Sequence, residues 1–410
     1  MQNDEKYSDI DRLLNSISYN LPSITKPTLK QLFEARLTEL NISTTAAAEI
    51  IGIEWRALAA ILEGTQKLIN FVSLSKMARF LKIPNSELVE IFLIMLEENN
   101  KDEIADIEKA QFVIENFDLA VLKKAGVIDD ANDFNKIEQQ LNSLFGFNSI
   151  FEYTTSNIQP AFSAGAIKPK NLLTRNFWIE ATIRMLKKIN NPYEYDRKGL
   201  IEFFPKIRWH SMNVEMGMLE VVKSLYKLGI TVIYQPYIET LHLRGATLSI
   251  NNKPCIALTD YKGFYPTLWF ALVHELYHVL FDWEEIKDNK YHLSEEELDF
   301  FTTEEKEAEA NSFAREYLFS KDKIKEVKSF LRNKIFVETY AKNNHVHPSI
   351  IYIFSAFEES KNDKKAFANI HRKMPNIELC LNSLVNTSWK AKIPISNIVD
   401  RRKTEIFNNL

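Results

Sequence analysis

The stretch FALVHELYHVLFDW, residues 270–283, contains two histidines four residues apart and a glutamate directly after the first histidine. On a helix, residues at i and i+4 lie one above the other, so His274 and His278 can bind the same metal ion. Glu275 points to the side of this pair, where its carboxylate can reach a water molecule held by the metal without being a ligand. The spacing H-E-x-x-H therefore predicts a Zn2+ site with Glu275 as general base.

The alternative is a helix whose histidines form ordinary hydrogen bonds inside a core. The residues on both sides of the pair are nearly all apolar. Burying two imidazoles and a carboxylate together among them, without a shared partner, would cost several kcal/mol. A metal ion removes this cost, so the sequence favours the metal site.

A catalytic zinc usually has three protein ligands and one open position, so this site needs a third ligand. The metzincin pattern would require a glycine and a further ligand where this chain has Phe281 and Glu284. The other source is a glutamate on a following helix, and residues 302–318, TTEEKEAEANSFAREYL, have a helical pattern. Glu307 shares a face with small residues and is the preferred ligand, although spacing alone separates it only weakly from Glu309.

The elements that must position these residues are mostly helices. Only ten glycines and thirteen prolines occur among 410 residues, which argues against a fold rich in strands and turns. Three short segments, GITVIYQPYI, RGATLSI and KPCIALTD, are instead predicted as strands of a small antiparallel sheet. Helical patterns resume at Pro266. The predicted fold class is therefore mainly α, in an α+β arrangement.

The segments WFALVHELYHVLF and EAEANSFAREYLFS resemble the ImmA/IrrE family of metallopeptidases, whose pattern is H-E-L-small-H followed by E-x-x-A-N-x-F-A. The resemblance covers about residues 206–358 and implies a zincin-like peptidase domain. Carried over to this chain, it implies zinc ligands at His274, His278 and Glu307 and a general base at Glu275.

One departure from the family pattern lies inside the first motif, where Tyr277 occupies a position that is normally small. Its side chain could narrow the substrate cleft, supply a hydroxyl or pack in the core, and packing is the favoured interpretation. His345 and His347 follow in a segment that also resembles the family. With Tyr277, they are candidates for stabilising an oxyanion or contacting substrate, although a lone histidine is more often structural.

The N-terminal part of the chain, from NISTTAAAEI to FLKIP, resembles the XRE class of helix-turn-helix domains. Two predicted helices meet at a turn around Gly52, and the second, from about Glu54 to Glu63, would be the recognition helix. Double-stranded operator DNA is the expected partner. The candidate contacts are Thr44, Thr45, Trp55, Arg56 and Lys67.

The charge of this module supports DNA binding only weakly. Residues 28–84 contain seven basic and five acidic residues, a net charge of +2, which is a small attraction for phosphate. A homodimer would double the contacts. The alternative is a helix-turn-helix fold used for protein contacts or dimerisation.

The length of 410 residues predicts more than one domain. The predicted divisions are an N-terminal tail (1–27), a helix-turn-helix bundle (28–100), a helical linker region (101–205), the peptidase domain (206–358) and an extension of unknown role (359–410). The N-terminus is polar and acidic, and the longest apolar run, IFLIML, is too short to cross a bilayer. The expected location is the cytoplasm, with no membrane partner.

Two functions are consistent with these features. The first is a zinc endopeptidase fused to a DNA-binding domain. The family resemblance implies that such a protein is a transcriptional regulator or antitoxin-like protein and that its substrate is a protein, such as a repressor, a toxin or the chain itself. The alternative is a non-proteolytic antitoxin or repressor that binds DNA and a partner toxin and uses the peptidase fold as a scaffold. The presence of Glu275 favours the enzyme, because a scaffold needs no general base.

Overall fold

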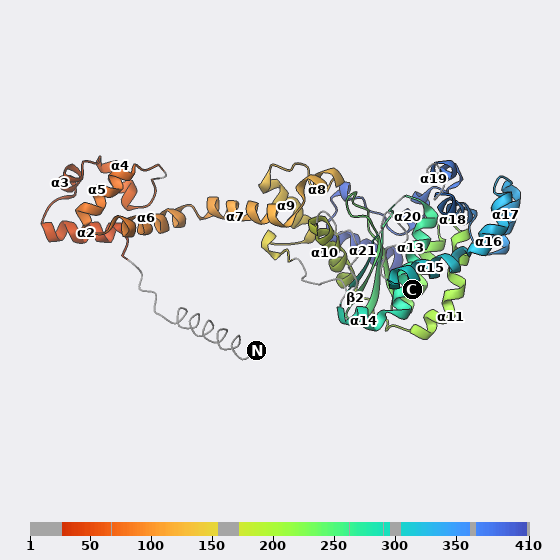
Figure 1. Ribbon diagram of the computed structural model, residues 1–410. Coiled ribbons are helices and arrows are strands. Elements are labelled where there is room, and N and C mark those ends of the chain that lie inside the picture. Colours follow the sequence, from red (N-terminus) through yellow and green to blue (C-terminus); the bar gives the residue numbers. More distant parts are fainter. Residues whose placement is uncertain are drawn as a thin grey trace. The chain divides into compact units, whose positions relative to one another are not determined.

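The computed structural model describes residues 27–66, 68–154, 172–261, 263–289, 291–295, 305–360 and 366–407. The chain divides into two compact units, Met1–Glu108 and Lys109–Leu410, and each has its own hydrophobic core (Figure 1). Helices dominate both units, as the composition predicted. Among the described residues, none of the helices combines the length and apolar character needed to cross a membrane.

The first unit is a helical bundle with the predicted order of helix, turn and helix. Its helices are α2 (Leu29–Leu40), α3 (Thr44–Ile51), α4 (Trp55–Leu62), α5 (Phe71–Leu81) and α6 (Asn85–Asn99). Gly52 ends α3 in the left-handed conformation, with φ of +69°, and its N–H donates to the carbonyls of Ala48 and Glu49. This sharp stop lets α4 begin only three residues later.

The end of α4 is fixed by α6. The Asn99 side chain donates to the carbonyls of Glu63 and Gly64 at 2.8 and 3.0 Å. Gly64 has a φ of +68°, and a Cβ at this position would lie 2.7 Å from the Cβ of Met95. Only glycine therefore allows α6 to approach the turn after α4 so closely.

The second unit is built of helices around one mixed sheet. Its helices, beginning with α7 across the division, are α7 (Lys101–Asn116), α8 (Leu119–Ala125), α9 (Phe134–Phe145), α10 (Leu172–Ile189), α11 (Arg197–Ile207), α12 (Gly217–Lys227), α13 (Tyr265–Phe281), α14 (Trp283–Asn289), α15 (Glu305–Phe319), α16 (Lys321–Val327), α17 (Lys334–Asn343), α18 (Pro348–Ser360), α19 (Ala366–Ile370), α20 (Ile377–Ser383) and α21 (Ile395–Arg402). Helix α13 packs on two central strands of the sheet and against α15 and α18.

The sheet has the order β1–β3–β2–β4. Its strands are β1 (Thr231–Tyr234), β2 (Leu243–Ile250), β3 (Lys253–Leu258) and β4 (Tyr291–Glu295). Strands β2 and β3 form a hairpin whose two turn residues, Asn251 and Asn252, both have positive φ. The hairpin places β3 beside β1 in parallel, so the prediction of a purely antiparallel sheet is wrong for this pair. Strand β4 was not predicted.

The core of the second unit includes segments from outside the predicted peptidase domain. Buried side chains from residues 101–205, such as Leu141 and Trp178, and from residues 359–410, such as Cys380 and Val399, belong to the same cluster as the sheet and α13. The indole of Trp389 donates to the carbonyl of Pro236 at 3.0 Å. These segments therefore support the sheet directly and are more than a linker and an appended tail.

Candidate metal centre

Helix α13 carries the H-E-x-x-H residues through the middle of the second unit. It starts with a proline in its first turn, where the missing N–H costs nothing, and continues in apolar residues on nearly every side. The exposed fractions of His274, Glu275 and His278 are only 3%, 0% and 0%. The three residues of the motif thus lie on the buried face of α13, where a polar atom without a partner is costly.

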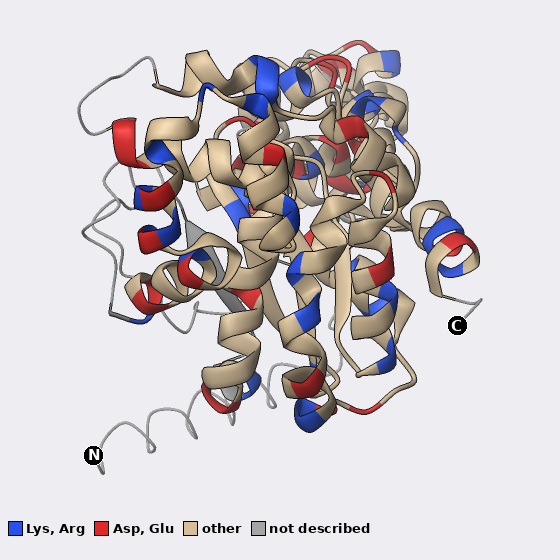
Figure 2. Ribbon diagram, turned by 90° about the vertical axis from the view of Figure 1, so that its right-hand side faces the viewer, with Lys and Arg blue, Asp and Glu red and all other residues tan. Residues whose placement is uncertain are grey.

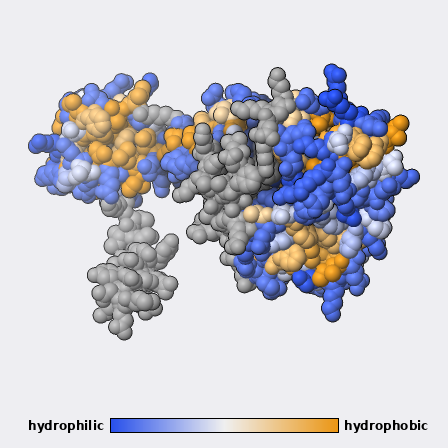
Figure 3. All heavy atoms as spheres, turned by 45° about the vertical axis from the view of Figure 1, so that its right-hand side comes forward, coloured by the Kyte–Doolittle hydropathy of each residue, from blue (hydrophilic) through white to orange (hydrophobic). Residues whose placement is uncertain are grey.

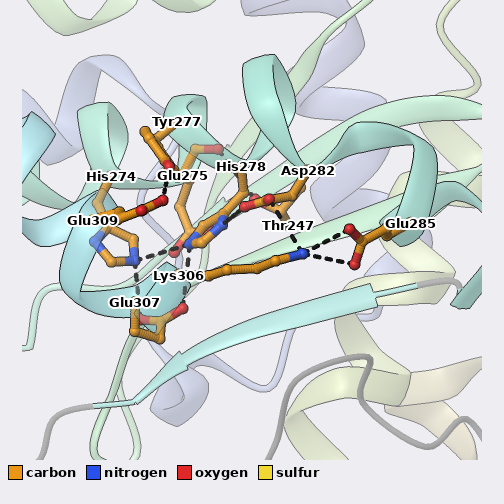
Figure 4. Close-up of polar contacts among 10 residues, drawn as sticks. All are labelled: Thr247, His274, Glu275, Tyr277, His278, Asp282, Glu285, Lys306, Glu307 and Glu309. Atoms are coloured by element: carbon orange, nitrogen blue, oxygen red, sulfur yellow. Dashed lines mark hydrogen bonds and ion pairs between the residues drawn. The ribbon is translucent and has the colours of Figure 1, made fainter. Parts of the chain in front are cut away.

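The three predicted ligands converge in space (Figure 4). The Nε2 atoms of His274 and His278 lie 3.2 Å apart, and each lies 3.2 Å from one carboxylate oxygen of Glu307. In a tetrahedral zinc site with bonds of about 2.0–2.1 Å, neighbouring ligand atoms are about 3.3 Å apart. Among the described residues, His274, His278 and Glu307 form the group of possible metal ligands, of the types His, Cys, Asp and Glu, whose ligand atoms all lie within 4.8 Å of one another. The donor set and its spacing fit a zinc ion.

The choice between Glu307 and Glu309 is decided by the packing of α15 on α13. Ala310 and Ala314 are fully buried and allow the two helices to approach closely. Glu307 faces α13 and is 7% exposed, whereas Glu309 is on the exposed side of α15. Glu309 instead accepts a hydrogen bond from the hydroxyl of Tyr277 at 2.7 Å.

A second layer of charged residues orients His278. Its Nδ1 lies 2.7 Å from Asp282, one helical turn further on, so Nε2 is directed at the other two ligands. Lys306 pairs with Asp282 at 3.5 Å and with Glu285 at 2.7 Å, which ties α14 and α15 together beside the site (Figure 4). Asp282 could have been proposed from the sequence, because it stands at i+4 from His278.

The electrostatics of the group favour a cation. Burial by itself lowers the pKa of His278, but hydrogen bonds to Asp282 and Glu307 and the charges of Glu307 and Glu275 outweigh it and raise the pKa to about 9. Three carboxylates therefore surround the two imidazoles and stabilise positive charge there. A divalent ion would supply that charge in place of the proton.

Glu275 is turned away from the ligand group towards β2. One of its oxygens, Oε2, accepts a hydrogen bond of 2.6 Å from the Thr247 hydroxyl, and Oε1 is buried with no hydrogen-bond partner among the described residues. A small cavity reaches this carboxylate. The residues that line it are Arg244, Phe270, Ala271, His274, Glu275, Glu307 and Asn311.

The structure does not bring the predicted oxyanion helpers to this cavity. Tyr277 is partly buried, packs against Phe313 and donates its hydroxyl hydrogen to Glu309. Burial, and to a smaller extent the Glu309 carboxylate, raises the pKa of Tyr277. His347 lies against Tyr265, which is nine residues before His274 and hence about 13 Å away along the helix axis. Burial lowers the pKa of His347 to about 4.

His345 lies on Trp209, with ring centroids 4.8 Å apart, and is not among the residues that line the described cavity. Arg244 and Asn311, which do line it, were not singled out in the sequence. Asn311 belongs to the E-x-x-A-N pattern and could have been noticed there. Arg244 and Thr247 lie on a strand far along the chain from the histidines, so only the fold places them at the site.

Four of the five predicted DNA-contact residues lie on the surface of the first unit. Thr44 and Thr45 are exposed in the first turn of α3, and Trp55 and Arg56 are exposed in the first turn of α4. Lys67 lies outside the described residues.

Apolar side chains also gather on the surface of the first unit (Figure 3), and the exposed ones include Ile50, Leu68, Phe71 and Val72. On the second unit, basic and acidic residues are interspersed over the helices in view (Figure 2).

Comparison with known proteins identifies one region of the chain. No curated protein and no solved structure matches the chain. Residues 227–351 match the family model of the M78 peptidases, described as the IrrE N-terminal-like domain. The matched region includes the four strands, both histidines of α13, Glu275 and Glu307. This part of the chain is therefore similar to the IrrE-like domain of a peptidase family, in agreement with the resemblance seen in its motifs.

Proposed function

We propose that the second unit is a zinc-dependent endopeptidase that cleaves a protein substrate. The observation that carries this proposal is the buried group of two imidazoles and one carboxylate, with ligand atoms 3.2 Å apart. A second buried carboxylate, that of Glu275, stands beside the group and is bonded to Thr247 rather than to the ligands. Three ligands and a separate base are the requirements of metal-assisted hydrolysis.

When bound, a zinc ion would act as a Lewis acid that polarises a peptide carbonyl and makes a water molecule more acidic. Glu275 would accept the proton of the attacking water and deliver it to the leaving amine. Asp282 would keep the ring of His278 in the orientation that directs Nε2 to the site. The side-chain amide of Asn311 and the guanidinium of Arg244, both at the cavity, would donate hydrogen bonds to substrate carbonyls.

The edge of the sheet supports a peptide as substrate. Strand β4 pairs with β2 and is one of the two outer strands of the described sheet. Thr247, whose hydroxyl binds Glu275, pairs with His292 of β4, so this edge strand passes beside the general base. An extended peptide can add to such an edge through main-chain hydrogen bonds. We infer that the substrate is bound in this way, with its scissile bond over the cavity.

Removal of the metal tests the proposal. The purified chain is expected to contain one zinc ion and to cleave denatured casein. Cleavage should stop on treatment with 1,10-phenanthroline and return with one equivalent of Zn2+, because the ion supplies both the Lewis acid and the reactive water. Mass spectrometry of the products and metal analysis measure the two effects. A zinc-loaded chain that cleaves neither casein nor itself, or cleavage that survives complete metal removal, would contradict the proposal.

We also propose that the first unit binds double-stranded DNA and that the chain is a cytoplasmic transcriptional regulator whose peptidase substrate is a repressor, a toxin or the chain itself. The short connection between α3 and α4 and the exposed Thr44, Thr45 and Arg56 support this proposal. The exposed apolar residues Ile50 and Phe71 favour an added role in protein contacts, such as a homodimer. The competing proposal is a non-proteolytic antitoxin that binds DNA and a toxin.

Arg56→Ala should weaken DNA binding by about 10- to 100-fold, because an arginine on the first turn of a recognition helix can bind a guanine edge. The probe is a duplex enriched by the wild-type chain from a random-sequence pool, and binding is measured by fluorescence anisotropy at one fixed salt concentration. Arg79→Ala, an exposed arginine on α5, is the matched control and should have a smaller effect. Failure to enrich any duplex would refute DNA binding and leave protein contacts as the role of this unit.

A further inference from the structure

We infer that Thr247 is a positioning residue for Glu275: its hydroxyl holds one carboxylate oxygen and leaves the other to exchange the proton during peptide hydrolysis. This inference rests on the proposed peptidase function and assigns a role to a residue of β2 that lies outside the H-E-x-x-H segment. It follows from one hydrogen bond, one close approach of the backbone and the position of β2 within the sheet.

The hydrogen bond between the two side chains is short and fully buried. The hydroxyl of Thr247 lies 2.6 Å from Oε2 of Glu275 and 3.4 Å from the main-chain carbonyl of the same residue, so the carboxylate is the better acceptor. Both residues are 0% exposed. A hydrogen bond from a hydroxyl to a carboxylate is among the stronger ones in proteins, and burial removes competition from bulk water.

The position of Thr247 is itself fixed by the sheet. Strand β2 is paired on both sides, and Thr247 lies opposite Ile256 of β3 and His292 of β4. Threonine is branched at Cβ, which restricts the rotation of its side chain. The hydroxyl is therefore a rigid donor, and the carboxylate that it binds has a defined orientation.

Gly245 makes room for the second oxygen of the carboxylate. It is two residues before Thr247 on β2, so both face α13. A Cβ at this position would lie only 2.6 Å from Oε1 of Glu275 and 3.1 Å from its carboxyl carbon. The absent side chain therefore allows the carboxylate of Glu275 to approach the strand this closely.

The two oxygens of Glu275 consequently have different environments. Oε2 is bound by Thr247, while Oε1 is buried without a hydrogen-bond partner among the described residues, and the carboxylate lines the cavity beside His274 and Glu307. The oxygen with free lone pairs is the one suited to accept a proton from water and return it to the amine. Thr247 keeps that oxygen in place and does not itself touch the reacting atoms.

The test uses Thr247→Val, which keeps the shape of the side chain and removes the hydroxyl, and Thr247→Ser, which keeps the hydroxyl. Each full-length variant is loaded with Co2+, and acetohydroxamate binding is followed by the visible spectrum. A metal-bound hydroxamate donates a hydrogen bond to the general base, so its affinity reports the position of Glu275 without turnover. Thr247→Val should weaken hydroxamate binding about tenfold, which corresponds to the loss of one hydrogen bond to a charged group. Thr247→Ser keeps that hydrogen bond and should weaken hydroxamate binding less than about threefold.

The same variants should separate kcat from KM on casein. Thr247→Val is expected to lower kcat by about 10- to 100-fold with KM unchanged, because the base is misplaced but the substrate contacts remain. The control is Thr231→Val, the same change at a buried threonine of β1 in the same sheet. It should behave like wild type in both measurements, and all variants should keep one metal ion per chain.

Equal hydroxamate affinity in wild type and Thr247→Val, or an equal loss in Thr231→Val, would overturn the inference. If Thr247→Val fails to fold, Gly245→Ala is used instead. Its added Cβ displaces Oε1 of Glu275 while the hydroxyl of Thr247 remains. Unchanged hydroxamate affinity in Gly245→Ala would also overturn the inference. The proposed function fails in a different way. It is refuted if wild type holds no metal, or if Glu275→Gln binds acetohydroxamate as tightly as wild type.

Discussion

Glu275→Gln is expected to lower kcat for the cleavage of casein by about 10²- to 10⁴-fold, the usual contribution of a general base. Glutamine has the same shape as glutamate and can still accept the hydrogen bond from Thr247, so the buried site should keep its structure. An amide cannot take up the proton of the attacking water. Because Glu275 is not among the converging ligand atoms, the variant should keep its full content of zinc.

The control for this variant is Glu309→Gln, the same chemical change on the exposed side of α15. Glu309 binds the hydroxyl of Tyr277 at the protein surface, and its loss should change kcat by less than about threefold, as expected for an exposed hydrogen bond. Initial rates and metal analysis are measured on the same preparations. Wild-type activity in Glu275→Gln would rule out this residue as the base.

Glu307→Ala is expected to weaken zinc binding by more than about 100-fold, because it removes a direct ligand. Loss of a residue that only hydrogen-bonds to a ligand weakens metal binding by up to about 100-fold. His274 and His278 would remain, but the carboxylate beside them that offsets the charge of the ion would be missing. Zinc present at about 100 times Kd stabilises the folded wild type by about 2.7 kcal/mol. Glu307→Ala should lose this stabilisation, which is seen as a Tm that no longer rises when zinc is added.

Glu309→Ala is the matched control for the loss of the ligand, since it lies two positions away on the same helix but faces solvent. Competition with a fluorescent chelator gives the zinc affinity, and thermal unfolding with and without zinc gives the stabilisation. If Glu309→Ala loses zinc while Glu307→Ala retains it, the assignment of the third ligand must be reversed. Retention by both would mean that neither glutamate binds the ion.

The helix that carries the histidines is a case in which local sequence is sufficient. The i, i+4 spacing of His274 and His278 and their apolar surroundings depend only on residues within a few turns of one another. The same holds for the turn at Gly52 between α3 and α4, where one residue with positive φ ends a helix. Interactions of this short range are encoded in neighbouring residues and could be predicted without the fold.

The pairing of the strands in the sheet could not be predicted from local sequence. Three strand segments were recognised, but the parallel pairing of β1 with β3 and the addition of β4 were not. Strand β4 follows the histidine helix, and its partner β2 precedes that helix, so the pairing joins residues far apart in the chain. The packing of buried side chains between Val113 and Tyr153, between Phe177 and Phe204, and between Cys380 and Phe407 into the core of the second unit is equally nonlocal.

By itself, the sequence determined that one helix presents two imidazoles and a separate carboxylate to a common site, because helical periodicity requires it. Only the tertiary structure decided that Glu307, rather than Glu309, completes the group, since that choice depends on which face of α15 packs against α13. It also decided that Thr247 and Gly245 adjoin Glu275, and that His345 and His347 lie away from the cavity. These contacts depend on how distant segments pack, which no local spacing specifies.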